Sequence, residues 1–372
     1  MAVSSRFIKY GMQHIKTYIW RTYCSAVANV PRSCRGLVYT EYGDPAKVIS
    51  LQDFELPEFD EQSVFLEMLA TPINPADLNM VQGTYPIKPC LPAVGGNEGV
   101  GEVLAVGSGV KNINIGDWVL MASAGLGCWT EKKVLNEKDV LKIPVKEGLP
   151  VEVAAMLSVN PCTAYRMLKD FEYLHPGDVI LQNGANSGVG QAVIQLSANW
   201  GITSLNVVRD RDNFEELKEN LTSLGATYVV TEDEFQNANK IKEILKDHKP
   251  PRLAFNCVGG KSSTQLIRYL SEKGTMVTYG GMSRKPITVP TSAFIFKDIQ
   301  LRGFWMTKWN EYNLNSPERT MMLEDLCEMA KCGDFTTPDC ETFQLNDYEN
   351  ALLNSVSSFT KKSLFLMNSG RS

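Results

Sequence analysis

The periodicity of hydrophobic and polar positions changes near residue 151. Between about 36 and 147, apolar residues come in short alternating or continuous runs, such as Ser63–Leu69 and Gly101–Val106, separated by glycine and proline. This pattern predicts short strands joined by tight turns. Glycine is dense in the same region, at Gly95, Gly96, Gly99, Gly101, Gly107, Gly109 and Gly116. Such a density suits a small, curved, mainly antiparallel sheet.

Beyond Val151, apolar strands alternate with amphipathic helices. The predicted strands are Asp178–Gln182, Ser204–Val208, Tyr228–Val230, Leu253–Cys257 and Thr275–Tyr279. The predicted helices are Ala154–Met167, Gly188–Trp200, Phe214–Leu224, Ile241–Asp247 and Thr264–Leu270. This alternation predicts an α/β fold with a doubly wound parallel sheet covered on both faces. A helix at Asp347–Asn354 and a strand at Ser363–Leu366 end the chain, and we expect them to return to the first domain.

Composition is consistent with two ordinary globular domains. The chain has 372 residues, of which 44% are hydrophobic and 21% charged, and its net charge is −5. The negative charge argues against nucleic-acid binding, and no apolar run is long enough for a membrane span. Nine widely spaced cysteines with no C-x-x-C predict reduced thiols rather than a disulfide framework or a zinc ribbon.

The first 40 residues differ from the rest of the chain in charge. They contain no aspartate or glutamate and six basic residues, and a helix there would place Ile8, Met12 and Ile15 on one face. An acid-free amphipathic N-terminus with arginines is typical of a mitochondrial transit peptide; a basic tail without a targeting role is the alternative. We therefore expect residues 1–34 to be a transit peptide, the protein to be mitochondrial, and the mature chain to begin near Arg35.

A glycine-rich turn, residues 184–190, follows the strand Asp178–Gln182 and leads directly into a helix. In this context, backbone N–H groups and the positive end of the helix bind the pyrophosphate of a dinucleotide. Aligned on Gly190, the first two glycines of G-x-G-x-x-G are replaced by Ala185 and Ser187. A purely structural turn is the alternative.

The end of the second strand bears on the choice of cofactor. NAD sites usually place an acidic residue there for the ribose 2′-hydroxyl group, whereas NADP sites favour arginine near the 2′-phosphate. Arg209 and Arg211 therefore favour NADPH, because arginine is always charged and grips phosphate bidentately. Asp210 and Asp212 keep NADH open, and solvated or helix-capping charges are the alternative for all four.

Over roughly residues 36–370 the chain resembles the medium-chain dehydrogenase/reductase superfamily. Zinc-containing members carry a Gly-His-Glu-x-x-Gly element, which here runs from Gly96 to Gly101 with Asn97 in place of the histidine, and no four-cysteine lobe follows. We therefore predict that the protein holds no metal. The resemblance implies a GroES-like domain of residues 35–157 and 309–372 and a Rossmann NADPH-binding domain of residues 158–308.

Within the superfamily the chain is similar to the mitochondrial trans-2-enoyl-thioester reductases. The similarity is carried by Gly83-Thr84-Tyr85-Pro86, Gly280-Gly281-Met282 and Gly303-Phe304-Trp305. It implies that Tyr85 is the catalytic residue; without it, Tyr85 would be an ordinary turn aromatic. A phenol has a pKa of about 10, so it stays protonated at working pH and can donate a hydrogen bond or a proton as the α-carbon is protonated.

The resemblance also implies the residues that bind the cofactor. They are Asn160 near the nicotinamide; Asn186, Ser187, Gly188 and Val189 at the pyrophosphate; Arg209, Asp210 and Arg211 at the adenosine phosphate; Tyr279, Gly280, Gly281, Met282, Phe304, Trp305 and Met306 flanking the nicotinamide; and Lys362 near the C-terminus. For Lys362 a solvated surface lysine is the alternative.

Together these observations predict NADPH-dependent reduction of trans-2-enoyl-CoA or enoyl-acyl carrier protein in mitochondrial fatty acid synthesis. The resemblance further implies a homodimer that joins cofactor-domain sheets at their edges, with Asp298–Phe304 as the candidate edge strand. An NADPH:quinone reductase is the nearest alternative and need not use Tyr85. A non-catalytic NADPH-binding regulatory protein is a second alternative, and it would bind the cofactor without turnover.

Overall fold

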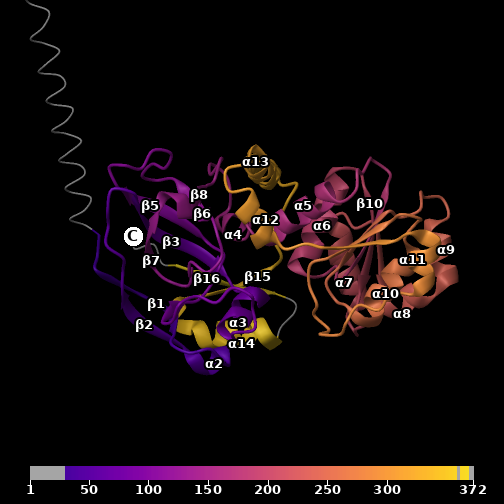
Figure 1. The fold of residues 1–372 in the computed structure, drawn as a ribbon, viewed down its shortest axis with the longest axis horizontal. Helices are drawn as coiled ribbons and strands as arrows, with labels where there is room; N and C mark the ends of the chain where they lie inside the picture. Colours follow the sequence, from indigo (N-terminus) through magenta and orange to yellow (C-terminus); the bar gives the residue numbers. More distant parts are fainter. Residues whose placement is uncertain (1–29, 358–360, 368–372) are drawn as a thin grey trace, which may run out of the picture. The chain divides into compact units, whose positions relative to one another are not determined.

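The computed structural model describes residues 30–357 and 361–367, and the chain divides into two compact units (Figure 1). Unit 1 contains the chain up to Met156 and again from Asp339, and unit 2 is Leu157–Pro338. Most of the predicted transit peptide lies outside the described residues. Its last two residues, however, begin the first strand, and Cys34 is buried there. None of the helices in the described residues is long and apolar enough to cross a membrane.

Unit 1 is built mainly of strands, which form two sheets. The strands are β1 (Ser33–Tyr39), β2 (Ile49–Glu55), β3 (Ser63–Pro72), β4 (Ala93–Val94), β5 (Val100–Val106), β6 (Trp118–Met121), β7 (Lys132–Asn136), β8 (Val140–Lys142), β15 (Cys340–Phe343) and β16 (Lys362–Leu366). The helices are α2 (Pro45–Val48), α3 (Pro75–Val81), α4 (Val151–Ala155), α14 (Tyr348–Ser357), and the 3-10 turns η1 (Glu137–Asp139) and η2 (Leu345–Asp347). One sheet has the order β2-β1-β4 and the other β15-β16-β3-β5-β6-β8, with β7 paired to β3. Every pair except β15–β16 is antiparallel, which confirms the predicted architecture.

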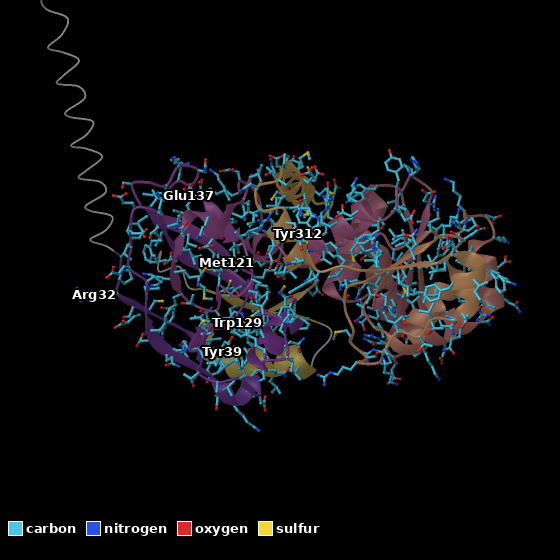
Figure 2. All side chains as sticks on the ribbon, in the orientation of Figure 1. Arg32, Tyr39, Met121, Trp129, Glu137 and Tyr312 are labelled. Atoms are coloured by element: carbon cyan, nitrogen blue, oxygen red, sulfur yellow. The ribbon has the colours of Figure 1, made fainter. Side chains whose placement is uncertain are left out.

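The core of unit 1 gathers around Trp129, which is fully buried and labelled with Tyr39 in Figure 2. The Trp129 indole donates to the carbonyl oxygen of Pro72 at 3.2 Å and packs edge-on against Phe365, with 6.0 Å between ring centroids. Phe365 lies on β16, so the C-terminal strand completes this core, as the sequence predicted. Glycine is required beside the indole, because a Cβ atom on Gly96 would lie 2.5 Å from it.

Unit 2 is a six-stranded parallel sheet with the order β11-β10-β9-β12-β13-β14. The strands are β9 (Val179–Asn183), β10 (Thr203–Val208), β11 (Tyr228–Thr231), β12 (Leu253–Asn256), β13 (Thr275–Thr278) and β14 (Gln300–Gly303). The helices are α5 (Asn160–Asp170), α6 (Gly188–Asn199), α7 (Phe214–Ser223), α8 (Glu232–Gln236), α9 (Ala238–Leu245), α10 (Gly260–Tyr269), α11 (Thr291–Lys297), α12 (Met306–Tyr312) and α13 (Pro317–Cys332).

Helices cover both faces of this sheet. On one face, side chains from α8, α9, α10 and α11 pack with Leu205 and Val207 of β10; on the other, α6 and α7 pack with Val208. Val207 and Val208 are neighbours in the sequence and enter different cores, because successive strand residues point to opposite faces. The doubly wound parallel sheet predicted from the alternating pattern is therefore confirmed.

Several helices differ from the sequence prediction: α2, α3, α8, α11 and α12 were not predicted, and two further cases are informative. The helix expected over Ala154–Met167 is broken, because α4 ends at Ala155 and α5 begins at Asn160. Pro161 occupies the first turn of α5, where its missing N–H group removes no helical hydrogen bond, so it marks a helix start. Helix α13 was not predicted, although it buries an apolar face that includes Met322, Leu326 and Ala330.

The second domain boundary also differs from its predicted position. Residues 309–338 were expected to belong with the first domain, but they lie in unit 2, and the boundary falls at Asp339. The reason is hydrogen bonding to α6: Gln195 bonds both the N–H and the carbonyl group of Thr336, at 2.7 and 3.0 Å. The Asn199 amide likewise donates to the carbonyl of Asp334 at 2.9 Å.

Candidate active site

The glycine-rich turn lies at the carboxyl end of β9, the strand at which the order of unit 2 reverses. The chain continues from β9 to β10 and β11 on one side, and later to β12, β13 and β14 on the other. At such a switch point the loops after neighbouring strands separate and leave a crevice, which is where dinucleotides bind in open α/β sheets.

The conformation of the turn explains its departures from the glycine fingerprint. Gly184 has φ +59, and Cys257 lies so close to it that any side chain would collide. Gly190 is needed for close packing, since a Cβ there would stand 2.5 Å from the carbonyl oxygen of Ala185. Ser187 is the N-cap of α6, and its hydroxyl oxygen accepts the Gly190 N–H at 3.1 Å. The serine thus stabilises the helix start, whose first N–H groups face the turn.

Asn160 begins α5 and lies against this turn. A Cβ on Gly188 would stand 2.7 Å from the Asn160 Nδ2, so the two residues are in direct contact. Asn186 lies on the same turn, and its carbonyl oxygen accepts a hydrogen bond from Gln191 at 3.0 Å. The structure therefore brings the predicted nicotinamide-side residue together with the pyrophosphate turn.

The loop after β13 supplies the next predicted group. Its backbone is tied to the end of β12, because the Tyr279 N–H donates to Asn256 at 3.0 Å and the Met282 N–H donates to Cys257 at 2.9 Å. Gly281 faces open space, and Met282 is 61% exposed. The space around Gly281 and Met282 is therefore open to solvent.

The Tyr279 side chain ends next to Ser187 and Cys257. Its hydroxyl group is buried beside the Ser187 hydroxyl and the Cys257 thiol, and within the described part of the chain it makes no hydrogen bond of good geometry. Burial is the main cause that raises its pKa well above the usual value, and the Cys257 thiol adds to the effect. A buried hydroxyl without a well-aligned partner is costly, so a ligand with a polar group at the turn would satisfy it.

The segment Phe304–Met306 follows β14. The Phe304 N–H donates to Thr278 at 2.9 Å, and its ring packs edge-on against Phe171 with 6.0 Å between centroids. Met306 is buried and Trp305 starts α12. These contacts place Phe304 beside the end of β13.

Two arginines follow β10 on the side of the sheet predicted to hold the adenosine phosphate. Arg209 and Asp210 are exposed and Arg211 is half-buried. Partial burial and the nearby positive charge of Arg209 lower the pKa of Arg211, and no carboxylate among the described residues pairs with Arg211. A partly buried guanidinium group without a carboxylate partner suits an anionic ligand.

Tyr85 lies in unit 1, in the turn that follows α3. The backbone carbonyl of Asn79 accepts the N–H groups of Thr84 and Tyr85 at 3.0 and 3.2 Å, and Gly83 has φ +70, with Tyr42 close to its Cα. The Tyr85 side chain is half-buried. The turn is therefore attached firmly to the last turn of α3.

Lys362 also belongs to unit 1, at the start of β16. Its ammonium group is buried and donates to the side-chain oxygen of Asn74. Burial lowers its pKa, while the negative charges of Glu98 and Asp77 oppose that shift. Lys362 is therefore not a solvated surface lysine. The residues around it, Asn74 and Asp77, were not singled out by sequence reasoning, although together they form the capping box of α3.

Asn97 occupies the position of the histidine in zinc-containing relatives. Both polar atoms of its side chain are engaged: Nδ2 donates to Asp77 at 2.6 Å and Oδ1 accepts the Gly125 N–H at 2.7 Å. Within residues 30–357 and 361–367, no three His, Cys, Asp or Glu side chains cluster as they would around a metal ion. The eight cysteines in the described residues are all free thiols.

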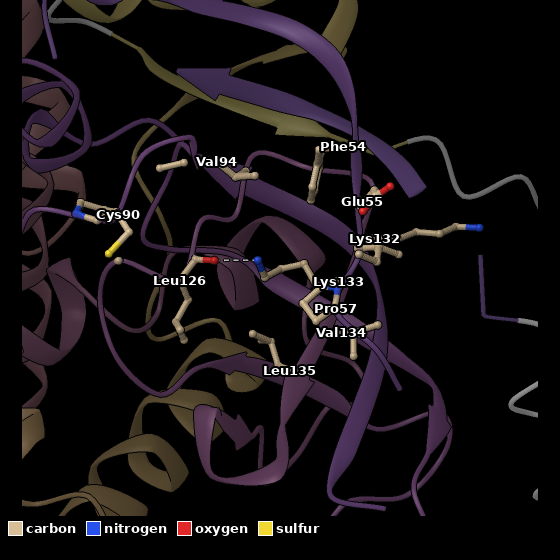
Figure 3. A pocket seen from close by; sticks show the side chains of 14 residues that line it. Phe54, Glu55, Pro57, Cys90, Val94, Leu126, Lys132, Lys133, Val134 and Leu135 are labelled. Carbon is tan, nitrogen blue, oxygen red and sulfur yellow. Dashed lines mark hydrogen bonds between the residues drawn. The ribbon is translucent and has the colours of Figure 1, made fainter. Parts of the chain in front are cut away.

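A hollow of about 350 Å³ lies in unit 1 between β2, β7 and the loops that carry Cys90 and Gly125 (Figure 3). The Lys133 ammonium points into it and donates to the carbonyl oxygens of Leu126 and Gly127, at 2.6 and 2.5 Å. Neither Tyr85 nor any predicted cofactor residue lines this hollow. Lys133 therefore supports the 125–127 loop, whose Gly125 contacts Asn97.

Polar residues at two strand ends complete the site in unit 2. Asn183 ends β9, and its side chain donates to the Asn256 Oδ1 at 2.8 Å and accepts the Cys257 N–H at 2.8 Å. Asn256 ends β12 and accepts the Gly259 N–H at 3.0 Å. Sequence reasoning missed both residues, although a buried amide that ends an otherwise apolar strand is a signal that would have found them.

Comparisons with known proteins agree with this architecture. Residues 60–145 match the family described as alcohol dehydrogenase GroES-like domain, and residues 188–317 match the family described as zinc-binding dehydrogenase. The human mitochondrial enoyl-acyl-carrier-protein reductase is 50% identical over 329 residues, which cover 88% of this chain and 87% of that protein. The protein of the same name from Xenopus tropicalis is 47% identical over 338 residues, covering 90% of this chain and 96% of that one.

Solved structures give the same result. The mitochondrial 2-enoyl thioester reductase Etr1p/Etr2p heterodimer of Candida tropicalis matches with a TM-score of 0.84 and 35% identity, over 90% of this chain and 99% of that one. A complex of Etr1p with NADP and crotonyl-CoA matches with a TM-score of 0.83, at the same identity and coverage. The chain therefore belongs to the mitochondrial enoyl-acyl-carrier-protein reductases, within the medium-chain dehydrogenase/reductase superfamily.

Proposed function

We propose that this protein reduces trans-2-enoyl thioesters of CoA or acyl carrier protein to saturated acyl thioesters, with NADPH as the reductant, in mitochondrial fatty acid synthesis. The observation that carries the proposal is the 50% identity over 87% of the human enoyl-acyl-carrier-protein reductase. The structural relative that was solved with NADP and crotonyl-CoA supports the same substrate class. The family members named here are mitochondrial, which supports the same location for this chain.

NADPH fits the residues of unit 2. The turn Asn186–Val189 would hold the pyrophosphate at the start of α6, and Arg209 and Arg211, with Asp210 between them, would hold the adenosine phosphate. Asn160 and the loops Tyr279–Met282 and Phe304–Met306 of unit 2, together with Lys362 of unit 1, complete the proposed cofactor set. Bound NADPH supplies the hydride that adds to the β-carbon of the enoyl thioester.

Tyr85 is the proposed proton donor. Hydride addition at the β-carbon leaves an enolate, and the reaction is completed by protonation of the α-carbon. A tyrosine hydroxyl group is protonated at neutral pH and can donate to the developing charge. The backbone of Tyr85 is held to α3 through Asn79, which restrains the position of the hydroxyl group.

The test is turnover by the purified full-length chain. NADPH oxidation is followed with trans-2-hexenoyl-CoA, then with a benzoquinone, and both assays are repeated with Tyr85→Phe. We expect the thioester to be reduced much faster than the quinone, and the Phe variant to lose at least about tenfold in kcat. Unchanged kcat in the variant would remove Tyr85 from its role.

Two other outcomes would favour the alternatives. Faster turnover of the quinone than of the thioester would support a quinone reductase. Solved quinone reductases share the fold of this chain at 24% identity. NADPH binding without turnover of either substrate would support a non-catalytic protein. Stoichiometric zinc in the same preparation would overturn the proposal that the enzyme works without a metal.

A homodimer built through unit 2 forms part of the proposal. Strand β14 is an edge of the parallel sheet, and all four of its residues are exposed. Leu301 on this strand is 37% exposed, and the neighbouring helix α11 exposes Phe296. An open edge strand beside apolar side chains suits pairing with a second copy. Sedimentation of Leu301→Pro tests this, because proline removes a backbone donor from the edge; a wild-type protein that sediments as a monomer contradicts it.

The proposed transit peptide ends before β1. Because Ser33 pairs with Glu55 and Cys34 is buried, cleavage after residue 34 would remove part of a strand. We therefore place the cleavage site upstream of Ser33. N-terminal sequencing of the protein recovered from mitochondria tests this position, and a mature chain that begins at or after Arg35 would contradict it.

A further inference from the structure

A cluster of polar side chains in unit 1 surrounds the start of α3. Asn74, Asp77 and Glu98 of this cluster are buried, and Asn97 and Lys362 are half-buried; they come from the start of α3, the 95–99 loop and β16. The exposed fractions of Asp77 and Glu98 are 1% and 0%. Charged side chains are seldom buried so completely unless they are paired or have a function.

Asp77 is the centre of this cluster. Its Oδ2 accepts the backbone N–H of Asn74 at 2.7 Å, and its Oδ1 accepts the Asn97 Nδ2 at 2.6 Å. Asn97 in turn accepts the Gly125 N–H at 2.7 Å. One chain of hydrogen bonds thus links the start of α3 to the 95–99 loop and to the loop at Gly125.

A second set of bonds reaches α3 through Asn74. The Asn74 amide donates to the Glu98 Oε2 at 2.8 Å, and its oxygen accepts the Lys362 ammonium group. The N-terminal end of α3 is therefore held by the 95–99 loop and by β16 as well as by Asp77. These contacts determine how the helix is oriented in unit 1.

The burial of Asp77 carries an electrostatic cost at neutral pH. Burial raises the pKa of Asp77 to about 6, although its hydrogen bonds and the charge of Lys362 act in the opposite direction. The folded state therefore disfavours the ionised carboxylate at neutral pH, relative to the unfolded chain. Carboxyl groups whose pKa is raised by burial are enriched at functional sites.

Helix α3 connects this cluster to Tyr85. The helix has only seven residues, so a movement of its start is carried to its end. There the carbonyl of Asn79 accepts both backbone N–H groups of Thr84 and Tyr85, and the Thr84 hydroxyl at 3.2 Å. The position of the Tyr85 backbone is thus set by the orientation of α3.

We infer that Asp77, through its hydrogen bond with Asn97, is a positioning residue that orients α3 and thereby the Tyr85 hydroxyl group. The inference rests on the proposed role of Tyr85. Asp77 acts through α3 and does not touch the reacting atoms. Its contribution is to hold the proton donor where the α-carbon is protonated, and a misplacement of about 1 Å can cost about a hundredfold in rate.

The decisive variant exchanges the two side chains, Asp77→Asn with Asn97→Asp. In the exchange, Asn at position 77 can accept the Asn74 N–H and donate to Asp at position 97, which can still accept the Gly125 N–H. All three hydrogen bonds are kept, and only the bond between positions 77 and 97 reverses its donor and acceptor. The single Asp77→Asn variant instead sets the amide groups of positions 77 and 97 donor to donor and loses a bond.

We expect Asp77→Asn to lower kcat for trans-2-hexenoyl-CoA by about tenfold to a hundredfold, with the KM for NADPH within about twofold of the wild-type value. The exchange should restore kcat to within about threefold of the wild type. Asp53→Asn, an exposed aspartate on β2, is the matched control and should change nothing. If Asp77→Asn fails to fold, the kcat of the double exchange variant alone tests the inference. A well-folded exchange variant with kcat more than about tenfold below wild type overturns the inference.

Two further measurements separate this inference from the proposed function. In a Tyr85→Phe background, Asp77→Asn should have little further effect on kcat, whereas a purely structural role would give the full loss again. Independently of activity, 3-fluorotyrosine at position 85 reports its surroundings by ¹⁹F NMR. The resonance should shift in Asp77→Asn and return in the exchange. A resonance that does not shift in Asp77→Asn overturns the positioning role of Asp77. This result does not depend on whether Tyr85→Phe shows Tyr85 to be catalytic.

Discussion

The side-chain amide of Asn160 lies directly against the backbone of Gly188, so that a Cβ on this glycine would stand 2.7 Å from the Asn160 Nδ2. Contact between the start of α5 and the start of α6 places Asn160 beside the pyrophosphate turn. A side chain at position 188 would push Asn160 away from the turn. The contact between Asn160 and the turn therefore requires glycine at position 188.

The first prediction concerns Gly188. Gly188→Ala should push Asn160 away from the turn and weaken NADPH binding by at least about tenfold, because 3.0 Å is the closest that such atoms ordinarily approach. The measurement is the Kd for NADPH by fluorescence titration. The fold should survive, so the far-UV spectrum is the control. An unchanged Kd would mean that Asn160 has no part in holding the cofactor.

The second prediction separates NADPH from NADH. Arg211→Ala removes one of the two guanidinium groups predicted to hold the 2′-phosphate, so the Kd for NADPH should rise by about tenfold or more while that for NADH stays within about twofold. The NADPH affinity of the wild type should also fall with added salt. Arg268→Ala, an exposed arginine on α10, is the matched control. Equal losses for both cofactors would place Arg211 away from the phosphate.

The third prediction is the pH dependence of Asp77. The pKa of this carboxyl group rises from 3.8 to about 6 on folding, so the folded state binds the proton more tightly. Tighter proton binding by the folded state adds to the free energy of unfolding. This contribution is fully present below about pH 4 and is lost as the pH rises through 6, and it amounts to roughly 3 kcal/mol in total. Besides Lys362 of the cluster, the titratable groups that interact with Asp77 are Tyr39 and Cys128.

The pH dependence is measured as the difference in the free energy of unfolding between the wild type and Asp77→Asn. The free energy of unfolding of the wild type, relative to Asp77→Asn, should fall between about pH 4 and pH 7. Over the same range kcat should rise, because only the carboxylate accepts both N–H donors. Urea unfolding and steady-state kinetics measure the two trends. A relative stability that does not change with pH would show that the carboxyl group does not titrate in this range.

The fourth prediction concerns the core of unit 1. Trp129 is fully buried, and the Cα of Gly95 lies against its indole ring. Gly95→Ala should destabilise the protein by about 1–3 kcal/mol, because the ring cannot move away in a packed core. In a Trp129→Phe background the same substitution should cost less, since the smaller ring leaves space. Thermal unfolding of the four proteins measures both effects, and additive losses would contradict the contact.

The sequence alone determined the features that depend on local signals. The strand, turn and helix at β9 and α6 follow from an apolar run, a glycine-rich turn and an amphipathic repeat, which are adjacent in the chain. The same holds for the parallel sheet of unit 2, because each strand carries its own apolar pattern. Tyr85 was found through family resemblance, and its half-buried turn has no pattern that would single it out.

Tertiary structure decided what depends on partners far apart in the sequence. Residues 309–338 belong to unit 2 because Gln195 and Asn199 bond the backbone after α13, and nothing within that segment indicates this. Asp77 becomes a buried, hydrogen-bonded carboxylate only when Asn97 and the 362–366 strand are folded against α3. Burial and hydrogen bonding are properties of a three-dimensional environment, whereas the periodic pattern of a sequence records only which face of each element is apolar.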